Sequence, residues 1–118
     1  MTVKQDQYKT ADTQESPFSI QTDLADDNLN ITISGRLDTI TSPELLSIFQ
    51  KTYKKGRIST VTINLQSMTY ISSAGLRVFL IIRKTLERHD QFHITNMNET
   101  VKEIMSATGF LNLFSCEF

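Results

Sequence analysis

The sequence is poor in several features that mark particular classes of protein. One cysteine, Cys116, in 118 residues excludes an internal disulfide and favours a reducing, cytoplasmic compartment, with the thiol packed as a small apolar group. Twelve basic and 13 acidic residues give a net charge of −1, and without a Lys/Arg stripe this argues against nucleic-acid binding. The longest apolar run, Val78–Ile82, is far too short to span a bilayer, and the first residues contain no apolar signal region.

What is present is the spacing of apolar residues expected for a small domain of strands and helices. Residues 1–16 are polar and are expected to form a flexible tail, which leaves 17–118 as one domain with a single core. Apolar and polar residues alternate strictly over Leu29–Gly35, so residues 29, 31 and 33 should face the core. Similar patterns predict strands at residues 18–24, 29–35, 61–65 and 92–96, with a hairpin turn at 26–28.

Helical signals predict three helices. The first starts within Thr41–Glu44, where Thr41 with Glu44 fits a capping box and Ser42 before Pro43 fits a cap followed by proline. It ends at residues 54–56, and its apolar face consists of Leu45, Leu46, Phe49 and Tyr53. The second helix runs from about Ser73 to Arg88.

The third helix is capped by Asn98 and ends at Gly109, with Val101, Ile104 and Met105 turned inward. Residues 110–114 are apolar and should dock on the body as a strand or a short helix, while Gly35–Asp38 should leave the second strand as a loop. A hairpin followed by alternating strands and helices predicts an α/β or α+β sandwich whose central strands are parallel.

The stretch Met68–Lys84 organises the chain, because it joins a polar corner to a strongly apolar helix. Ser72 and Ser73 stand where a hydroxyl can cap the first turn, and the positive end of a helix favours an anion. At helical spacing, the least buried face of this helix carries Ser73, Arg77, Ile81, Lys84 and Arg88. Gly75 in the first turn indicates either close approach of another backbone or tight packing on the sheet.

Three motifs carry a resemblance to a known family. They are Ile71-Ser-Ser-Ala-Gly-Leu76, the preceding Ile63-Asn-Leu65, and Gly35-Arg-Leu-Asp38 upstream. Together they resemble the STAS domain, and more closely the bacterial anti-sigma factor antagonists, over residues 17–115. The resemblance implies a STAS-like α/β sandwich: a mixed sheet of about four to five strands covered mainly on one face by helices.

The resemblance also implies a regulatory role. In that family the second residue of an Asp-Ser-Ser/Thr/Ala-Gly corner is a phosphoserine, which aligns with Ser73, while Ser72 stands where Asp is usual and acts as cap or backup acceptor. The unphosphorylated chain would bind an anti-sigma factor that is also a serine kinase, and so free a sigma factor. Phosphorylation of Ser73 would end the interaction, and a phosphatase would restore it. The implied partner surface comprises Asp38, Ser72, Ser73, Ala74, Gly75, Arg77 and Ile81.

An enzyme is not expected. His89 and His93 lie at and beyond the far end of the helix from Ser73, about 20 Å away at about 1.5 Å per residue, so neither is a base for that serine. The sequence has no Gly-x-Ser-x-Gly elbow, no glycine-rich phosphate loop and no zinc-ligand spacing. We therefore expect no catalytic residue, metal or cofactor.

Other interpretations stay open. Asp38 could satisfy only local backbone donors, or do this and also face the partner. The chain could be a STAS module that scaffolds a complex or holds a small ligand beside Asp38 and Ser73. A structural dimer through Ile81 or the 110–118 region is a third possibility. Phosphate on Ser73 would separate the regulatory role from the others.

Overall fold

The strands and helices follow the order expected from the sequence. The computed structural model describes residues 18–88, 91–110 and 115–117, so the predicted tail at 1–16 and most of 110–114 lie outside the described residues. Its elements are β1 (Ser19–Ala25), β2 (Asn28–Leu37), α1 (Ser42–Thr52), β3 (Thr60–Asn64), β4 (Met68–Ile71), α2 (Ser73–Thr85), β5 (Phe92–Thr95), α3 (Glu99–Ala107) and β6 (Ser115–Glu117). The four predicted strands are present, with ends shifted by at most two residues.

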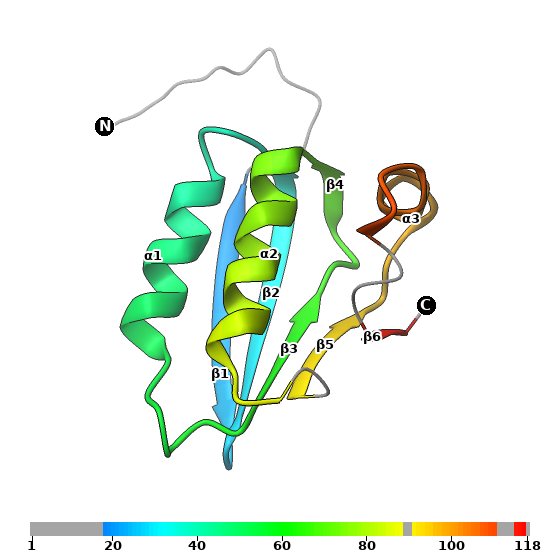
Figure 1. The fold of residues 1–118 in the computed structure, drawn as a ribbon. Coiled ribbons are helices and arrows are strands. Elements are labelled where there is room, and N and C mark those ends of the chain that lie inside the picture. The colour runs from blue at the N-terminus through cyan, green and yellow to red at the C-terminus, as the bar shows by residue number, and fades with distance from the viewer. Residues whose placement is uncertain (1–17, 89–90, 111–114, 118) are drawn as a thin grey trace, which may run out of the picture.

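The strands form one mixed sheet. Its main path runs β1-β2-β3-β5-β6, and the short β4 pairs with β2 off this path. The β1–β2 hairpin is antiparallel, and the β2–β3, β3–β5, β5–β6 and β2–β4 pairs are parallel. In Figure 1, α1 and α2 lie side by side across one face of the sheet, and α3 lies near β4. The α/β sandwich expected from the sequence is confirmed.

Alternation along the central strands creates the core. Leu29, Ile31 and Ile33 of β2 are fully buried, whereas the residues between them are half-buried, as the pattern predicts. Val61 and Ile63 of β3 repeat this arrangement. One face of the sheet is therefore apolar and carries the helices, since burial of that surface stabilises the sandwich by roughly 25 cal/mol per Å².

The helix ends match the sequence signals in part. Asn98 caps α3, because its Oδ1 accepts a hydrogen bond from Val101 N at 3.0 Å, and Val101 and Met105 are buried. In α1, Leu45 and Phe49 are buried as predicted. None of the helices in the described part of the chain is long and apolar enough to cross a membrane.

Of the two predicted caps for α1, the Ser42 cap is wrong, and Thr41 is confirmed in position but not as part of a capping box. Thr41 stands at the N-cap position but makes no side-chain capping bond, because its hydroxyl donates to Arg36 O and accepts from Asp38 N, both at 2.8 Å. Ser42 is already the first helical residue and is buried. The hydroxyl that would complete the capping box therefore ties the preceding loop together.

The second strand is longer than predicted. Residues 35–38 were expected to form a loop, but β2 continues to Leu37 with a shift of register between Gly35 and Arg36. Gly35 has a φ of +85°, a conformation that glycine adopts without a Cβ penalty, and its N–H donates to Ser67 O at 2.9 Å. This kink moves β2 from its partner β3 to β4, which the sequence did not predict as a strand.

Gly75 allows the first turn of α2 to approach the end of the sheet. A Cβ at this position would lie 2.8 Å from Leu37 Cδ2 and 2.9 Å from Ile71 Cγ1, closer than real carbon atoms pack. Gly75 itself is buried, so it serves helix packing on the sheet, the second of the two interpretations of this glycine.

Gly75→Ala should therefore lower the free energy of unfolding by about 1–2 kcal/mol, since overpacking outweighs the gain in helix propensity. Urea denaturation would measure the change. In a Leu37→Ala background, which removes the nearest atoms, the added methyl should be less harmful. An equal loss in both backgrounds would contradict this account.

Candidate functional site

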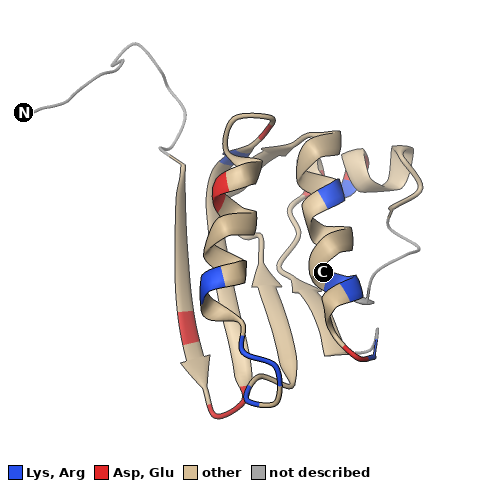
Figure 2. Ribbon diagram, turned by 60° about the vertical axis from the view of Figure 1, so that its left-hand side comes forward, with Lys and Arg blue, Asp and Glu red and all other residues tan. Residues whose placement is uncertain are grey.

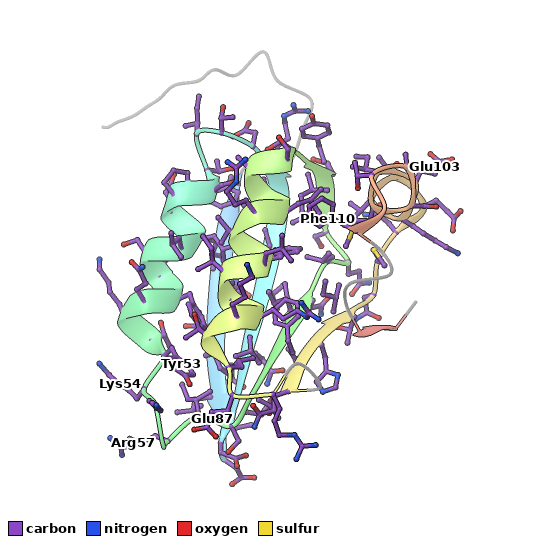
Figure 3. The ribbon with its side chains drawn as sticks, in the orientation of Figure 1. Tyr53, Lys54, Arg57, Glu87, Glu103 and Phe110 are labelled. Carbon is purple, nitrogen blue, oxygen red and sulfur yellow. The ribbon has the colours of Figure 1, made fainter. Side chains whose placement is uncertain are left out.

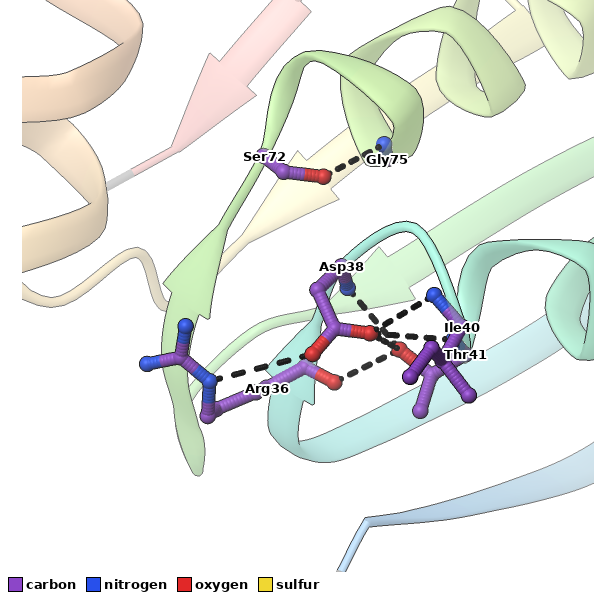
Figure 4. Close-up of polar contacts among 6 residues, drawn as sticks. All are labelled: Arg36, Asp38, Ile40, Thr41, Ser72 and Gly75. Atoms are coloured by element: carbon purple, nitrogen blue, oxygen red, sulfur yellow. Dashed lines mark hydrogen bonds and ion pairs between the residues drawn. The ribbon is translucent and has the colours of Figure 1, made fainter.

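Ser72 and Ser73 have different environments at the start of α2. Ser72 is half-buried at the N-cap position, with φ −96° and ψ 174°, and its Oγ accepts a hydrogen bond from Gly75 N at 3.4 Å (Figure 4). Ser73 is the first residue of the helix and is exposed. Ser72 therefore caps the helix, as its position predicts, while the side chain of Ser73 is accessible to another protein.

The pairing of β2 with β4 places the Asp38 loop beside this corner. Leu37 is the register partner of Ile71, and Ser72 N donates to Leu37 O at 2.9 Å. Because the carboxyl ends of parallel strands meet at one edge of a sheet, Asp38 and Ser72 continue from neighbouring positions (Figure 4). The structure thus brings together two motifs that are more than thirty residues apart in the chain.

The carboxylate of Asp38 organises its own loop. Its Oδ1 accepts hydrogen bonds from Ile40 N and Thr41 N, both at 3.0 Å, and lies 3.1 Å from the Thr41 hydroxyl. Arg36 Nε lies 3.8 Å from the other carboxylate oxygen, and its guanidinium sits 4.2 Å above the ring of Tyr70. Asp38 therefore satisfies local backbone donors, and these bonds hold the tip of the loop in one conformation.

These contacts also set the charge state of Asp38. Burial alone would raise its pKa, but hydrogen bonds from the backbone of Thr41 and Ile40, the Thr41 hydroxyl and the charge of Arg36 outweigh it. The pKa of Asp38 is consequently lowered from its ordinary value. The loop thus carries a fixed negative charge at neutral pH.

The outward face of α2 has the composition predicted from helical spacing. Ser73, Arg77, Ile81 and Lys84 are exposed on α2, and Arg88 is exposed just beyond it. Ala74 is half-buried, whereas Gly75 is buried. Of the seven predicted partner-surface residues, Gly75 therefore has no direct access to a partner, and the other six reach the surface to different degrees.

Ile40, which was not predicted as a surface residue, is 77% exposed at the tip of the Asp38 loop. Its neighbours in the sequence are two threonines, so a lone apolar residue in a polar loop was the available signal. Its N–H donates a hydrogen bond to Asp38 Oδ1, which fixes the backbone of the loop tip that carries this apolar side chain.

A small cavity lies far from this corner. It has a volume of about 90 Å³ and is lined by Tyr53, Lys55, Gly56, Ile58, Ser59, Leu86, Glu87 and Gln91. Figure 3 shows Tyr53, Lys54, Arg57 and Glu87 at the end of the molecule where α1 and α2 finish, opposite their first turns. Within the described residues, no group of three or more His, Cys, Asp and Glu side chains could hold a metal ion.

The sheet topology, the Gly-x-Leu-Asp loop and the serine-capped helix together define a class of domain. The STAS domain family model matches residues 19–117, and the chain belongs to this family. Its curated relatives include the anti-sigma-B factor antagonist of Staphylococcus epidermidis, 29% identical over 97 residues, a match that covers 81% of this chain and 89% of that protein. The Staphylococcus aureus (strain NCTC 8325 / PS 47) protein of the same name is 26% identical with the same coverage.

Solved structures share the fold. An anti-sigma factor antagonist from Mycobacterium paratuberculosis has a TM-score of 0.76 at 17% identity, covering 87% of this chain and 89% of that chain. The anti-sigma factor antagonist SpoIIAA in its unphosphorylated form has a TM-score of 0.64 at 14% identity, with coverages of 86% and 87%. Its phosphorylated form has a TM-score of 0.61 at 16% identity, with coverages of 85% and 90%. The resemblance expected from the sequence is confirmed.

Asp38→Asn should lower the free energy of unfolding at neutral pH. It should also make this free energy less sensitive to a fall in pH. Because the pKa of Asp38 is lowered by folding, its contribution is present above the unfolded pKa of about 3.9 and is lost as pH falls through the folded value. We expect the free energy of unfolding of the variant to be about 1 kcal/mol lower than that of wild type at pH 7. This difference should shrink toward zero at low pH. Urea denaturation from pH 7 to pH 3 would measure this. The exposed Asp23 of β1 supplies the control, Asp23→Asn, and equal pH profiles for both variants would refute the role of Asp38.

Proposed function

We propose that this chain is an anti-sigma factor antagonist that binds an anti-sigma factor with serine-kinase activity and is released when Ser73 is phosphorylated. The observation that carries the proposal is the exposed Ser73 at the first turn of a helix. This turn lies next to the Asp38 loop, which hydrogen bonds to the Asp38 carboxylate hold in place. The staphylococcal relatives named as anti-sigma-B factor antagonists support it. The fold shared with a SpoIIAA solved in phosphorylated and unphosphorylated forms supports the switch.

A phosphate on Ser73 fits the first turn of α2. It adds a charge of about −1.5 to −2 and three acceptor oxygens at the positive end of the helix dipole. Arg77 lies one turn further along the same exposed face. Since the capping bond comes from Ser72 and the side chain of Ser73 is exposed, phosphorylation leaves the packing of α2 unchanged.

The effect of phosphorylation is therefore exerted on the bound protein. A partner packed against the corner would have to desolvate a dianion, at a cost of several kcal/mol. A change of about 4 kcal/mol alters affinity roughly a thousandfold, which is enough for a switch without refolding. In this scheme the chain is the substrate and ligand of the kinase, not a catalyst. It acts in the cytoplasm, and a phosphatase reverses the modification.

Ser73 is the better acceptor of the two serines. Ser72 is half-buried and its Oγ accepts from Gly75 N, so a kinase would have to break the helix cap to reach it. The alternative of a small-ligand module gains nothing from the cavity, because that cavity lies at the opposite end of α1 and α2.

The direct test is an affinity capture from a lysate of the source organism with wild-type and Ser73→Asp baits. Wild type should retain an ATP-binding kinase-like protein. The affinity of Ser73→Asp for this protein should be at least a hundredfold lower, since a fixed negative charge imitates part of the phosphate. Mass spectrometry would identify the retained proteins. Equal retention by both baits, or no kinase-like protein on either, would overturn the proposal.

Phosphorylation itself provides the second readout. The retained kinase, purified and supplied with ATP, should add one phosphate to wild type and none to Ser73→Ala. Ser72→Ala is the matched control: it should accept phosphate, while losing about 1 kcal/mol of stability with the cap. Phosphate on Ser72 in the wild-type protein would contradict the assignment.

A further inference from the structure

All charged residues within α2 are basic, although the chain as a whole has a net charge of −1. The helix sequence contains no Asp or Glu, and its exposed residues include Arg77 and Lys84. Figure 2 shows Lys and Arg on α2 and no acidic residue along it. Surface charges of one sign on a rigid face attract a partner of the opposite sign and speed its association.

Two isoleucines are exposed, one in the Asp38 loop and one on α2. Ile40 is 77% exposed and Ile81 is 37% exposed. Ile81 lies two turns, about 12 Å, from Ser73 at about 1.5 Å per residue, and Arg77 stands midway between them. Single exposed apolar residues are common, and exposure alone is therefore not evidence of a binding surface. These two isoleucines differ in that Asp38 fixes the loop of Ile40, and in that Ile81 lies on the helix face that carries the cations.

We infer that the docking surface of the partner is acidic and apolar: carboxylates facing Arg77 and Lys84, and apolar pockets receiving Ile40 and Ile81. This inference rests on the proposed function, and it names the chemistry of the partner surface. The occupant is the anti-sigma factor kinase. Its acidic surface is favoured by charge complementarity with a helix face that has no carboxylate of its own.

An acidic partner also explains why one phosphate is sufficient. The phosphate would stand one turn from Arg77 and offset its charge, and it would face carboxylates of the partner at the same time. Both effects act against binding, the first by removing an attraction and the second by adding a repulsion. The phosphorylated form would therefore present a more negative corner than the unmodified form.

The test measures binding of the purified kinase, obtained in the capture experiment, to surface variants. Arg77→Gln/Lys84→Gln should lower the association rate about tenfold at low salt and flatten its dependence on salt. Ile40→Ala should raise the dissociation rate about tenfold, with the salt dependence unchanged. Because all three side chains are exposed, the variants should unfold at wild-type urea concentrations.

The matched control is Lys54→Gln/Lys55→Gln, which removes the same charge from exposed residues near the opposite end of α1. It should change the association rate less than twofold. Equal effects of the two double variants would overturn the inference, as would a rate that is unaffected or increased by Arg77→Gln/Lys84→Gln. If Ser73→Asp still abolishes binding in that case, the proposed function is supported and the inferred acidic partner surface is refuted. If no kinase binds wild type, both the proposed function and the inference are refuted.

Discussion

The change of partner along β2 is the constraint on which the site depends. β2 pairs with β3 as far as Thr32 and with β4 from Gly35 onward, and the shift between Gly35 and Arg36 marks the exchange. Gly35 adopts a φ of +85°, which allows the backbone to make this shift of register. Since the new pairing ends at Leu37 and Ile71, a single irregularity positions both the Asp38 loop and the first turn of α2.

This arrangement separates the fold from the proposed switch. Gly75, Leu37 and Ile71 hold the first turn of α2 on the sheet, and apolar residues along the helix are buried. The opposite face of the helix is exposed and contributes little to the core. A charge added there would change what can dock without removing these contacts, because Ser73 is exposed whereas the capping bond comes from Ser72 and Gly75 is buried.

Local patterns predicted the elements that local chemistry decides. Alternation identified the core face of β2, and the spacing of polar residues identified the caps at Ser72 and Asn98. β4 was not predicted, because four residues pair only once the distant end of β2 is in place. The Thr41 capping box failed for the same reason: Arg36 O and Asp38 N compete for its hydroxyl. Exposure of Ile40 likewise depends on contacts within a folded loop.

The neutral cap at Ser72 has a consequence for the proposed switch. A carboxylate at this position would already occupy part of the positive potential at the start of α2 and would repel a phosphate on the next residue. Ser72 satisfies Gly75 N without charge, so the helix end keeps its potential for an anion. Asp38 is the nearby acid in the described loop, and its carboxylate is engaged by Ile40, Thr41 and Arg36. Phosphorylation of Ser73 would therefore meet favourable local electrostatics, which places the cost of the modification on the complex with the partner.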